Sequence, residues 1–65
     1  MKPYQERVIL EQKELSERIA KLEQFLSNGD HSDVDIDQKA LLAKQLIAMK
    51  EYNRILNERI LLFTL

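Results

Sequence analysis

Hydrophobic positions in the first part of the chain alternate at spacings of four and three residues. The series consists of Val8, Gln12, Leu15, Ile19, Leu22 and Leu26. This spacing places the series on one face of an α-helix, as a heptad seam with Gln12 as its polar member. Pro3 stands in the first helical turn, where proline is tolerated. The pattern therefore predicts a helix over about residues 3–27.

A turn-forming segment follows this helix. Ser27 to Asp30 should end it, with Gly29 as a natural left-handed cap residue. Asp35, or alternatively Asp33, is a good N-cap for a second helix, and Gln38 follows Asp35 by three residues, as in a capping box. We therefore expect a loop over about residues 28–35.

The second half of the chain repeats the four-three alternation. Its series consists of Leu42, Leu46, Met49, Asn53, Leu56, Ile60 and Phe63. It predicts a helix over about residues 36–63 that packs antiparallel on the first helix, because the loop between them is short. Residues 1–65 should therefore form one all-α domain, a two-helix hairpin. Gln12 and Asn53 on the seams either fix the helix register or the oligomeric state, which is the favoured interpretation, or bind a ligand.

The second helix carries more apolar surface than one partner helix can cover. Its further series, which we name the apolar stripe, recurs every seven residues and consists of Leu41, Ala48, Ile55 and Leu62. A chain of 65 residues without cysteine lacks the burial and the disulfides that stabilise small domains. We therefore expect a compact helical homo-oligomer with the apolar stripe in its interface. The alternative is a marginal monomer that leaves this surface partly exposed.

Composition and motifs exclude several functions. Ten basic against eleven acidic residues give no field that would gather duplex nucleic acid. The longest apolar run, 60–63, is too short to span a membrane, which favours the cytoplasm. The single histidine is too little for a zinc site, and the acidic run 33–37 lacks the remaining ligands of a calcium loop. No enzyme motif is present, so we expect neither catalysis nor a cofactor.

Two local patterns involve charged or aromatic side chains on the first helix. Glu14 and Arg18 are spaced for an ion pair, since they lie four residues apart with the acid first. Tyr4 precedes Arg7 by one turn at the helix start. It is either a hydrophobic staple for a neighbouring subunit, which is the favoured reading, or a stacking surface for a planar ligand. In the second case Arg7, Arg18 or Lys21 would bind the phosphates of that ligand.

The order of short motifs along the chain resembles a known family. The opening Pro-Tyr-Gln-Glu-Arg-Val-Ile at 3–9 is followed by Lys13-Glu14-Leu15, Lys21-Leu22, Phe25-Leu26, Lys44-Gln45-Leu46, Ala48-Met49-Lys50 and Arg59-Ile60. These pieces resemble the phage anti-CBASS cyclic-nucleotide sponges, whose hairpin domain is shared with an anti-Thoeris sponge. The resemblance covers nearly the whole chain.

The resemblance implies a function. The protein would bind cyclic oligonucleotide messengers of bacterial immunity in the host bacterial cytoplasm and withhold them without cleavage. Members of this family form hexamers built from dimers. Cyclic dinucleotides bind between paired subunits, and some members hold cyclic trinucleotides at threefold sites. Cyclic ADP-ribose isomers are a further candidate class of ligand. The competing hypothesis is a non-catalytic helical adaptor whose apolar stripe binds another protein's helix.

The resemblance also implies site residues. An aromatic residue near the start of the family's first helix stacks on the ligand, and Tyr4 matches it by motif. A lysine further along that helix binds phosphate; Lys21 is our choice and Arg18 its rival. Polar and basic residues late in the second helix also contact the ligand, and here Arg59 and Thr64 correspond.

Overall fold

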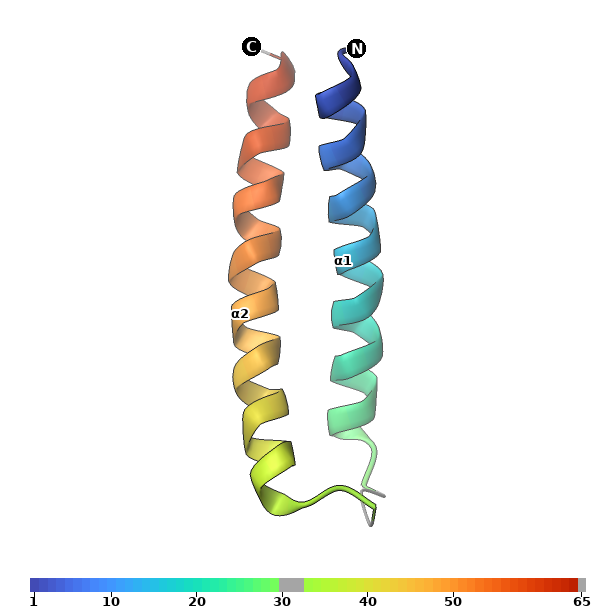
Figure 1. The fold of residues 1–65 in the computed structure, drawn as a ribbon, viewed down its shortest axis with the longest axis vertical. Coiled ribbons are helices and arrows are strands. Elements are labelled where there is room, and N and C mark those ends of the chain that lie inside the picture. The colour runs from blue at the N-terminus through green and yellow to red at the C-terminus, as the bar shows by residue number, and fades with distance from the viewer. Residues whose placement is uncertain (30–32, 65) are drawn as a thin grey trace.

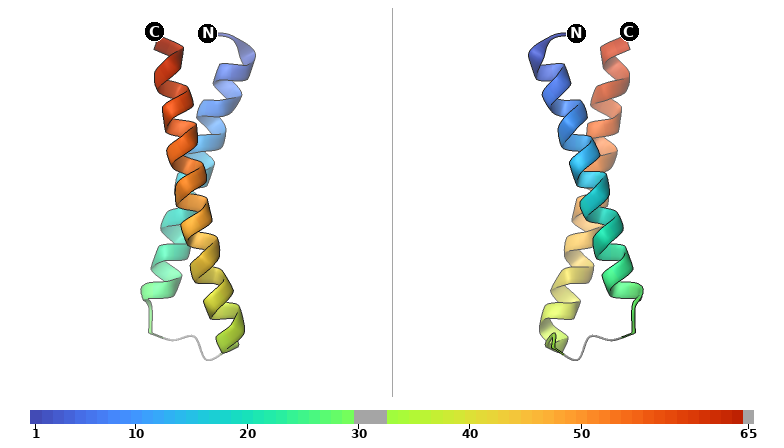
Figure 2. Two further views of the ribbon diagram at one scale, coloured as in Figure 1. Left: turned by 90° about the vertical axis from the view of Figure 1, so that its left-hand side faces the viewer. Right: turned by 90° about the vertical axis from the view of Figure 1, so that its right-hand side faces the viewer.

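The protein is a hairpin of two antiparallel helices (Figure 1). The structure is a computed structural model and describes residues 1–29 and 33–64. Helix α1 spans Pro3–Ser27, α2 spans Ile36–Leu61, and a short 3-10 helix, η1, spans Leu62–Thr64. The hairpin measures 47 × 15 × 14 Å, and its N- and C-termini lie at the same end. Figure 2 shows that the two helices cross near their midpoints.

The end of α1 differs from the prediction. Asn28 adopts an extended conformation (φ −77°, ψ 127°) and its N–H donates to the carbonyl of Gln24 at 3.1 Å. Gly29 has no positive φ, so the expected left-handed cap is wrong. The physical reason is that Asn28 already leads the chain out of the helix, so that no left-handed residue is needed. The predicted loop, about 28–35, includes residues 30–32, which lie outside the described residues.

The start of α2 agrees with the predicted position but not with the predicted hydrogen bonds. Asp35 is the extended residue that precedes α2, and its carbonyl accepts a hydrogen bond from the N–H of Lys39 at 2.9 Å. The Asp35 side chain makes no capping hydrogen bond, so the capping box with Gln38 is not formed. At its other end α2 tightens into η1, so the last predicted α-helical residues, 62 and 63, are in a 3-10 turn.

The core lies along the two predicted seams. Its buried side chains are Val8, Leu15, Ile19 and Leu56, with Leu46, Met49, Ile60 and Phe63 packed against them. Leu56 is fully enclosed, whereas every other seam residue of α2 keeps some exposure. The heptad pattern therefore identified the helix faces that meet, which confirms the predicted all-α hairpin.

The two seam amides bind each other across the hairpin. Gln12 Nε2 donates to Asn53 Oδ1 at 3.2 Å and to Ser16 Oγ at 2.7 Å. All three side chains are part-buried. Because a shift of one helix along the other would break this pairing, the geometry supports the register reading of Gln12 and Asn53.

The hairpin exposes much apolar surface. Its accessible surface is 5260 Å². A compact monomer of the same 7.7 kDa mass exposes about 4,300 Å². The apolar stripe contributes to this surface, since Leu41, Ile55 and Leu62 are 56%, 43% and 64% exposed. The excess of about 900 Å² is close to the roughly 800 Å² that one partner buries in a standard protein interface.

Candidate functional site

Tyr4 lies at the open end of the hairpin, against Phe63. The two ring centroids are 5.7 Å apart and the ring planes meet at 89°, an edge-to-face arrangement. Phe63 packs on the core and Tyr4 remains 46% exposed. Sequence reasoning missed this contact, although the end of the α2 seam at Phe63 and the short loop could have indicated it. The result is an aromatic ring that is supported by the core and open to solvent.

Two cationic side chains lie near the same end. Arg7 is one turn after Tyr4 on α1, and Arg59 is one turn before Phe63 on α2. Both are exposed. Thr64 belongs to η1, but its side chain lies outside the described part of the structure. The fold therefore brings Tyr4, Arg7 and Arg59 to one end.

Arg18 and Lys21 lie far from Tyr4 within one chain. They follow it by 14 and 17 residues on the same helix. At 1.5 Å per residue these intervals correspond to about 21 and 26 Å along the helix axis. One small ligand cannot touch Tyr4 and either cation of the same chain in this geometry. The structure thus separates the predicted α1 site residues into two groups.

The separated groups nevertheless share one side of α1. They belong to a series at alternating spacings of three and four residues, which we name the α1 flank: Tyr4, Arg7, Glu11, Glu14, Arg18, Lys21 and Phe25. By helix periodicity the α1 flank lies about 90° from the α1 seam. Its two ends are aromatic and its middle is charged.

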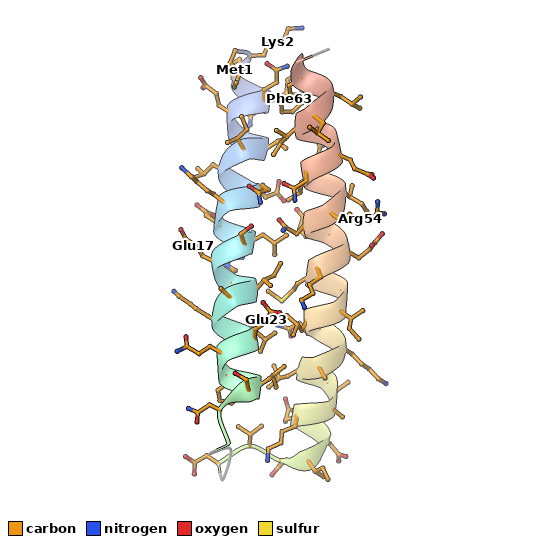
Figure 3. The ribbon with its side chains drawn as sticks, turned by 180° about the vertical axis from the view of Figure 1, so that it is seen from behind. Met1, Lys2, Glu17, Glu23, Arg54 and Phe63 are labelled. Carbon is orange, nitrogen blue, oxygen red and sulfur yellow. The ribbon has the colours of Figure 1, made fainter. Side chains whose placement is uncertain are left out.

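The α1 flank and the apolar stripe face the same side of the hairpin. An ion pair between Lys50 Nζ and Glu23, at 2.7 Å, bridges the helices on the other side. Figure 3 shows that other side, with Glu23 between the helices. A helix turns by 100° per residue, which places the α1 flank on the side of α1 opposite to Glu23. On α2 the apolar stripe lies about 125° around the helix from the α2 seam, in the direction away from Lys50. We name the side that carries the α1 flank and the apolar stripe the broad face.

Charged side chains form ion pairs with one another on the side of α2 that faces away from α1, whereas those of the α1 flank do not. Arg54 Nη2 donates to Glu51 at 2.6 Å and Arg54 Nη1 to Glu58 at 2.7 Å. The hydrogen bonds from Arg54 lower the pKa of the Glu51 carboxyl. By contrast, the expected Glu14–Arg18 pair is not formed; the ion pairs among the described residues are those of Arg54 and Lys50. Glu14 and Arg18 are both exposed to solvent, where an i,i+4 ion pair contributes little to stability.

Other kinds of site have no counterpart in the described part of the chain. Residues 1–29 and 33–64 contain no group of three or more side chains suited to hold a metal ion. Nor does any of their helices have the length and apolar character needed to cross a membrane.

These features define a small all-α hairpin that offers an aromatic ring and cations at its surface. The model of the Sequestin family matches residues 2–62, and the chain belongs to this family. The family name points to a sequestering, ligand-binding role. Comparison with curated proteins and with solved structures gives no match.

Proposed function

We propose that this protein sequesters cyclic oligonucleotide second messengers of the kind made by CBASS immunity. It would act for a phage, in the cytoplasm of the host bacterium, and would release the messenger chemically unchanged. Family membership supports binding and sequestration, and the order of motifs resembles that of the anti-CBASS sponges. No step of this role requires a catalytic group or a cofactor.

The observation that carries this proposal is the Tyr4 ring at the open end. Phe63 holds the ring edge-to-face while leaving it 46% exposed. Stacking of one base on such a ring contributes about 1–3 kcal/mol. Because the supporting contact already exists in the free chain, the Tyr4 side chain loses less conformational freedom when a ligand binds. Arg7 and Arg59, at the same end, would bind phosphate through charge-assisted hydrogen bonds.

A complete site would require more than one subunit. Tyr4 lies too far from Arg18 and Lys21 of its own chain, but a second copy could supply either cation. A cyclic dinucleotide is nearly two-fold symmetric, and so is a pair of identical subunits. We therefore propose a homo-oligomer, a hexamer as in the sponge family, in which paired subunits share each cyclic dinucleotide and cyclic trinucleotides form a second ligand class.

A depletion assay tests the proposal. Purified protein is mixed with cyclic dinucleotides, cyclic trinucleotides and cyclic ADP-ribose isomers, then filtered, and the free nucleotide is quantified before and after heating. Loss of one nucleotide that heating restores unchanged is the expected result. Conversion to a new product would identify an enzyme instead. Folded, oligomeric protein that depletes nothing from the panel would exclude sequestration of these ligands.

The exposed apolar stripe favours one alternative, an adaptor that binds another protein's helix. Leu41 and Leu62 are 56% and 64% exposed in the single chain. An amphipathic helix from another protein could cover such a surface. The two functions differ in what they require of Tyr4: an adaptor would keep its partner after Tyr4→Ala, whereas a sponge would lose its nucleotide.

A further inference from the structure

The exit from α1 places a glycine directly after an asparagine, Asn28 followed by Gly29. The end of α1 lies at the loop end of the hairpin, opposite to the chain termini (Figure 1). Both residues are exposed. The side-chain amide carbon of an asparagine is an electrophile, and the backbone nitrogen of the next residue is the nucleophile that closes a five-membered ring with it. Glycine in the second place favours this reaction, because it has no Cβ to crowd the attacking nitrogen.

The backbone at Asn28 leaves the rotation that closes this ring free. At ψ 127° the Gly29 nitrogen is turned away from the Asn28 side chain, so closure requires rotation about the Cα–C bond of Asn28. The Asn28 N–H donates to the Gln24 carbonyl at 3.1 Å, and this hydrogen bond lies on the helix side of the rotating bond. The rotation therefore turns the chain beyond residue 28 without breaking the hydrogen bond.

The surroundings of Gly29 leave room for this rotation. A Cβ built on Gly29 would have no described neighbour within 4 Å. No hydrogen bond joins the Gly29 N–H to another backbone group of residues 1–29 and 33–64. The connection to α2 comprises residues 29–35, whose extended length of about 23 Å exceeds the 15 Å width of the hairpin. The rotation therefore does not require α2 to move.

The other two asparagines of the chain lack this freedom. Asn53 and Asn57 lie within α2, where the N–H of the next residue belongs to the helical hydrogen-bond ladder. Ring closure at either position would require rotation about a bond inside the helix. The residues that follow them, Arg54 and Glu58, also carry side chains that crowd the attacking nitrogen. Sequence and structure therefore single out Asn28 among the three asparagines.

We infer that Asn28 is a site of spontaneous deamidation through a succinimide ring. The Gly29 nitrogen bonds to Cγ of Asn28, the Cγ–Nδ2 bond breaks, and the proton of the Gly29 N–H leaves with the amide nitrogen as ammonia. Water then adds to one of the two ring carbonyl carbons, and the bond from that carbon to the Gly29 nitrogen breaks. Water supplies the hydroxyl of the new carboxyl group and the proton that returns to the nitrogen; the carboxyl group then ionises. Attack at Cγ gives aspartate, and attack at the main-chain carbonyl gives isoaspartate.

The new carboxylate changes the charge at the end of α1. The formal net charge of the chain goes from −1 to −2, because a neutral amide becomes an anion. The carbonyl end of a helix is already negative, and the last turn of α1 has no basic residue to offset the added charge. Isoaspartate also inserts a further carbon atom into the main chain. The last turn of α1 should therefore fray in the modified chain.

The modification lies far from the open end of the hairpin. Tyr4 precedes Asn28 by 24 residues, which corresponds to about 36 Å along the helix axis. The modified chain should therefore keep the contact between Tyr4 and Phe63. The inference does not rest on the proposed function, since the reaction requires only water and the chain itself.

Peptide mapping of aged protein tests the inference. The wild-type chain is incubated in mildly alkaline buffer, digested, and analysed by mass spectrometry at each asparagine, with fresh protein digested in parallel. We expect progressive loss of the amide at Asn28, with isoaspartate and aspartate as products, and retention of Asn53 and Asn57. Methylation by a protein isoaspartyl methyltransferase detects the isoaspartate. An aged chain that keeps Asn28 intact, or that forms aspartate without isoaspartate, would overturn the inference.

Gly29→Val tests the role of the glycine. The new side chain enters open space and the backbone has no positive φ at this position, so the helix content should not change. A β-branched side chain beside the attacking nitrogen should remove most of the isoaspartate formed at Asn28. An unchanged rate of isoaspartate formation in Gly29→Val would contradict the ring mechanism.

Glu58→Gly is the matched control for the structure, because it places the same dipeptide inside α2. Asn57 should then keep its amide while the protein is helical, and should react as fast as Asn28 once urea unfolds the chain. Equal rates at Asn28 and Asn57 in the helical variant would show that the helix exit contributes nothing. The wild-type chain gives the same test without a substitution: Asn28 should react at a similar rate with and without urea, and a large acceleration by urea would overturn the inferred freedom of Asn28.

Discussion

The ring of Tyr4 meets the ring of Phe63 nearly at right angles, with 5.7 Å between the ring centroids. This contact connects the first turn of α1 to η1. Phe63 also packs on the core, which means that the orientation of Tyr4 depends on the packing of α2. Such a pair contributes about 0.5–1.5 kcal/mol beyond its buried area.

Phe63→Leu should release the Tyr4 ring while keeping an apolar side chain at this position. In a Tyr52→Phe background Tyr4 is the single tyrosine, and the chain has no tryptophan, so the near-ultraviolet circular dichroism of tyrosine reports on Tyr4 alone. We expect this signal to fall strongly with little change in helix content. Phe25→Leu is the matched control and should leave the tyrosine signal in place. An unchanged signal in Phe63→Leu would mean that Phe63 does not orient the ring.

Tyr4→Ala should abolish depletion of the bound cyclic nucleotide and leave the assembly intact. The reason is that the ring supplies base stacking but is only one of several apolar groups on the broad face. The depletion assay and native mass spectrometry measure the two effects separately. Tyr52→Phe, which keeps the ring at another exposed position, is the control and should deplete nucleotide normally. Retention of full binding by Tyr4→Ala would remove the stacking role.

Ile55→Glu should dissociate the oligomer, because it places a charge in the middle of the apolar stripe, where Ile55 is 43% exposed in the single chain. Sedimentation at several concentrations measures the molar mass. Asn57→Glu introduces the same charge on the other side of α2 and should leave the mass unchanged. A wild-type mass for Ile55→Glu would show that the stripe is not an interface.

Asn53→Leu should destabilise the hairpin by about 1–2 kcal/mol, because it leaves the Gln12 amide without its partner across the seam. Adding Gln12→Leu should recover most of this loss through apolar contact, as replacement of both partners often does. Urea unfolding of both single variants and the double variant gives the coupling energy. Strictly additive effects would indicate that the hydrogen bond between the two amides contributes nothing to stability.

Leu56→Ala should cost about 2–5 kcal/mol of folding stability, since Leu56 is fully buried and its truncation leaves a cavity in the core. A chain of this size has few kcal/mol to lose, so the variant should be largely unfolded at low concentration. Thermal unfolding followed by circular dichroism measures the change. Leu10→Ala removes an exposed side chain of the same type and should shift the midpoint far less.

The heptad seams made the fold predictable, because periodic burial of residues such as Leu15 and Leu56 leaves a direct trace in the sequence. Terminal geometry was less predictable. The cap at Gly29 was wrong because Asn28 can leave a helix in an extended conformation as well as glycine can in a left-handed one. Likewise Lys50 binds Glu23 across the hairpin, a contact that depends on helix register rather than on local spacing.

The candidate site was predictable only in part. Tyr4 was identified as an aromatic residue outside the seam, but its support by Phe63 depends on which α2 residue lies level with the first turn of α1. Arg18 and Lys21 were assigned to the same ligand as Tyr4 from sequence, although the helix predicted over about 3–27 already implies an axial separation of about 21 and 26 Å within one chain. The structure has this helix uninterrupted over Pro3–Ser27. Residue types indicate the chemistry of a site, whereas deciding which residues of the two helices can touch one ligand requires knowing which of them lie at the same level.

The small core has a thermodynamic consequence for the proposed role. With Val8, Leu15, Ile19 and Leu56 as the buried side chains of the described residues, folding, association and ligand capture would be linked equilibria governed by mass action. A ligand that bridges two subunits would then raise the melting temperature of the assembly, and dilution would release it. The fraction of messenger that stays bound would therefore rise steeply with the concentration of the protein. Sequestration would become effective only above a threshold concentration of the protein.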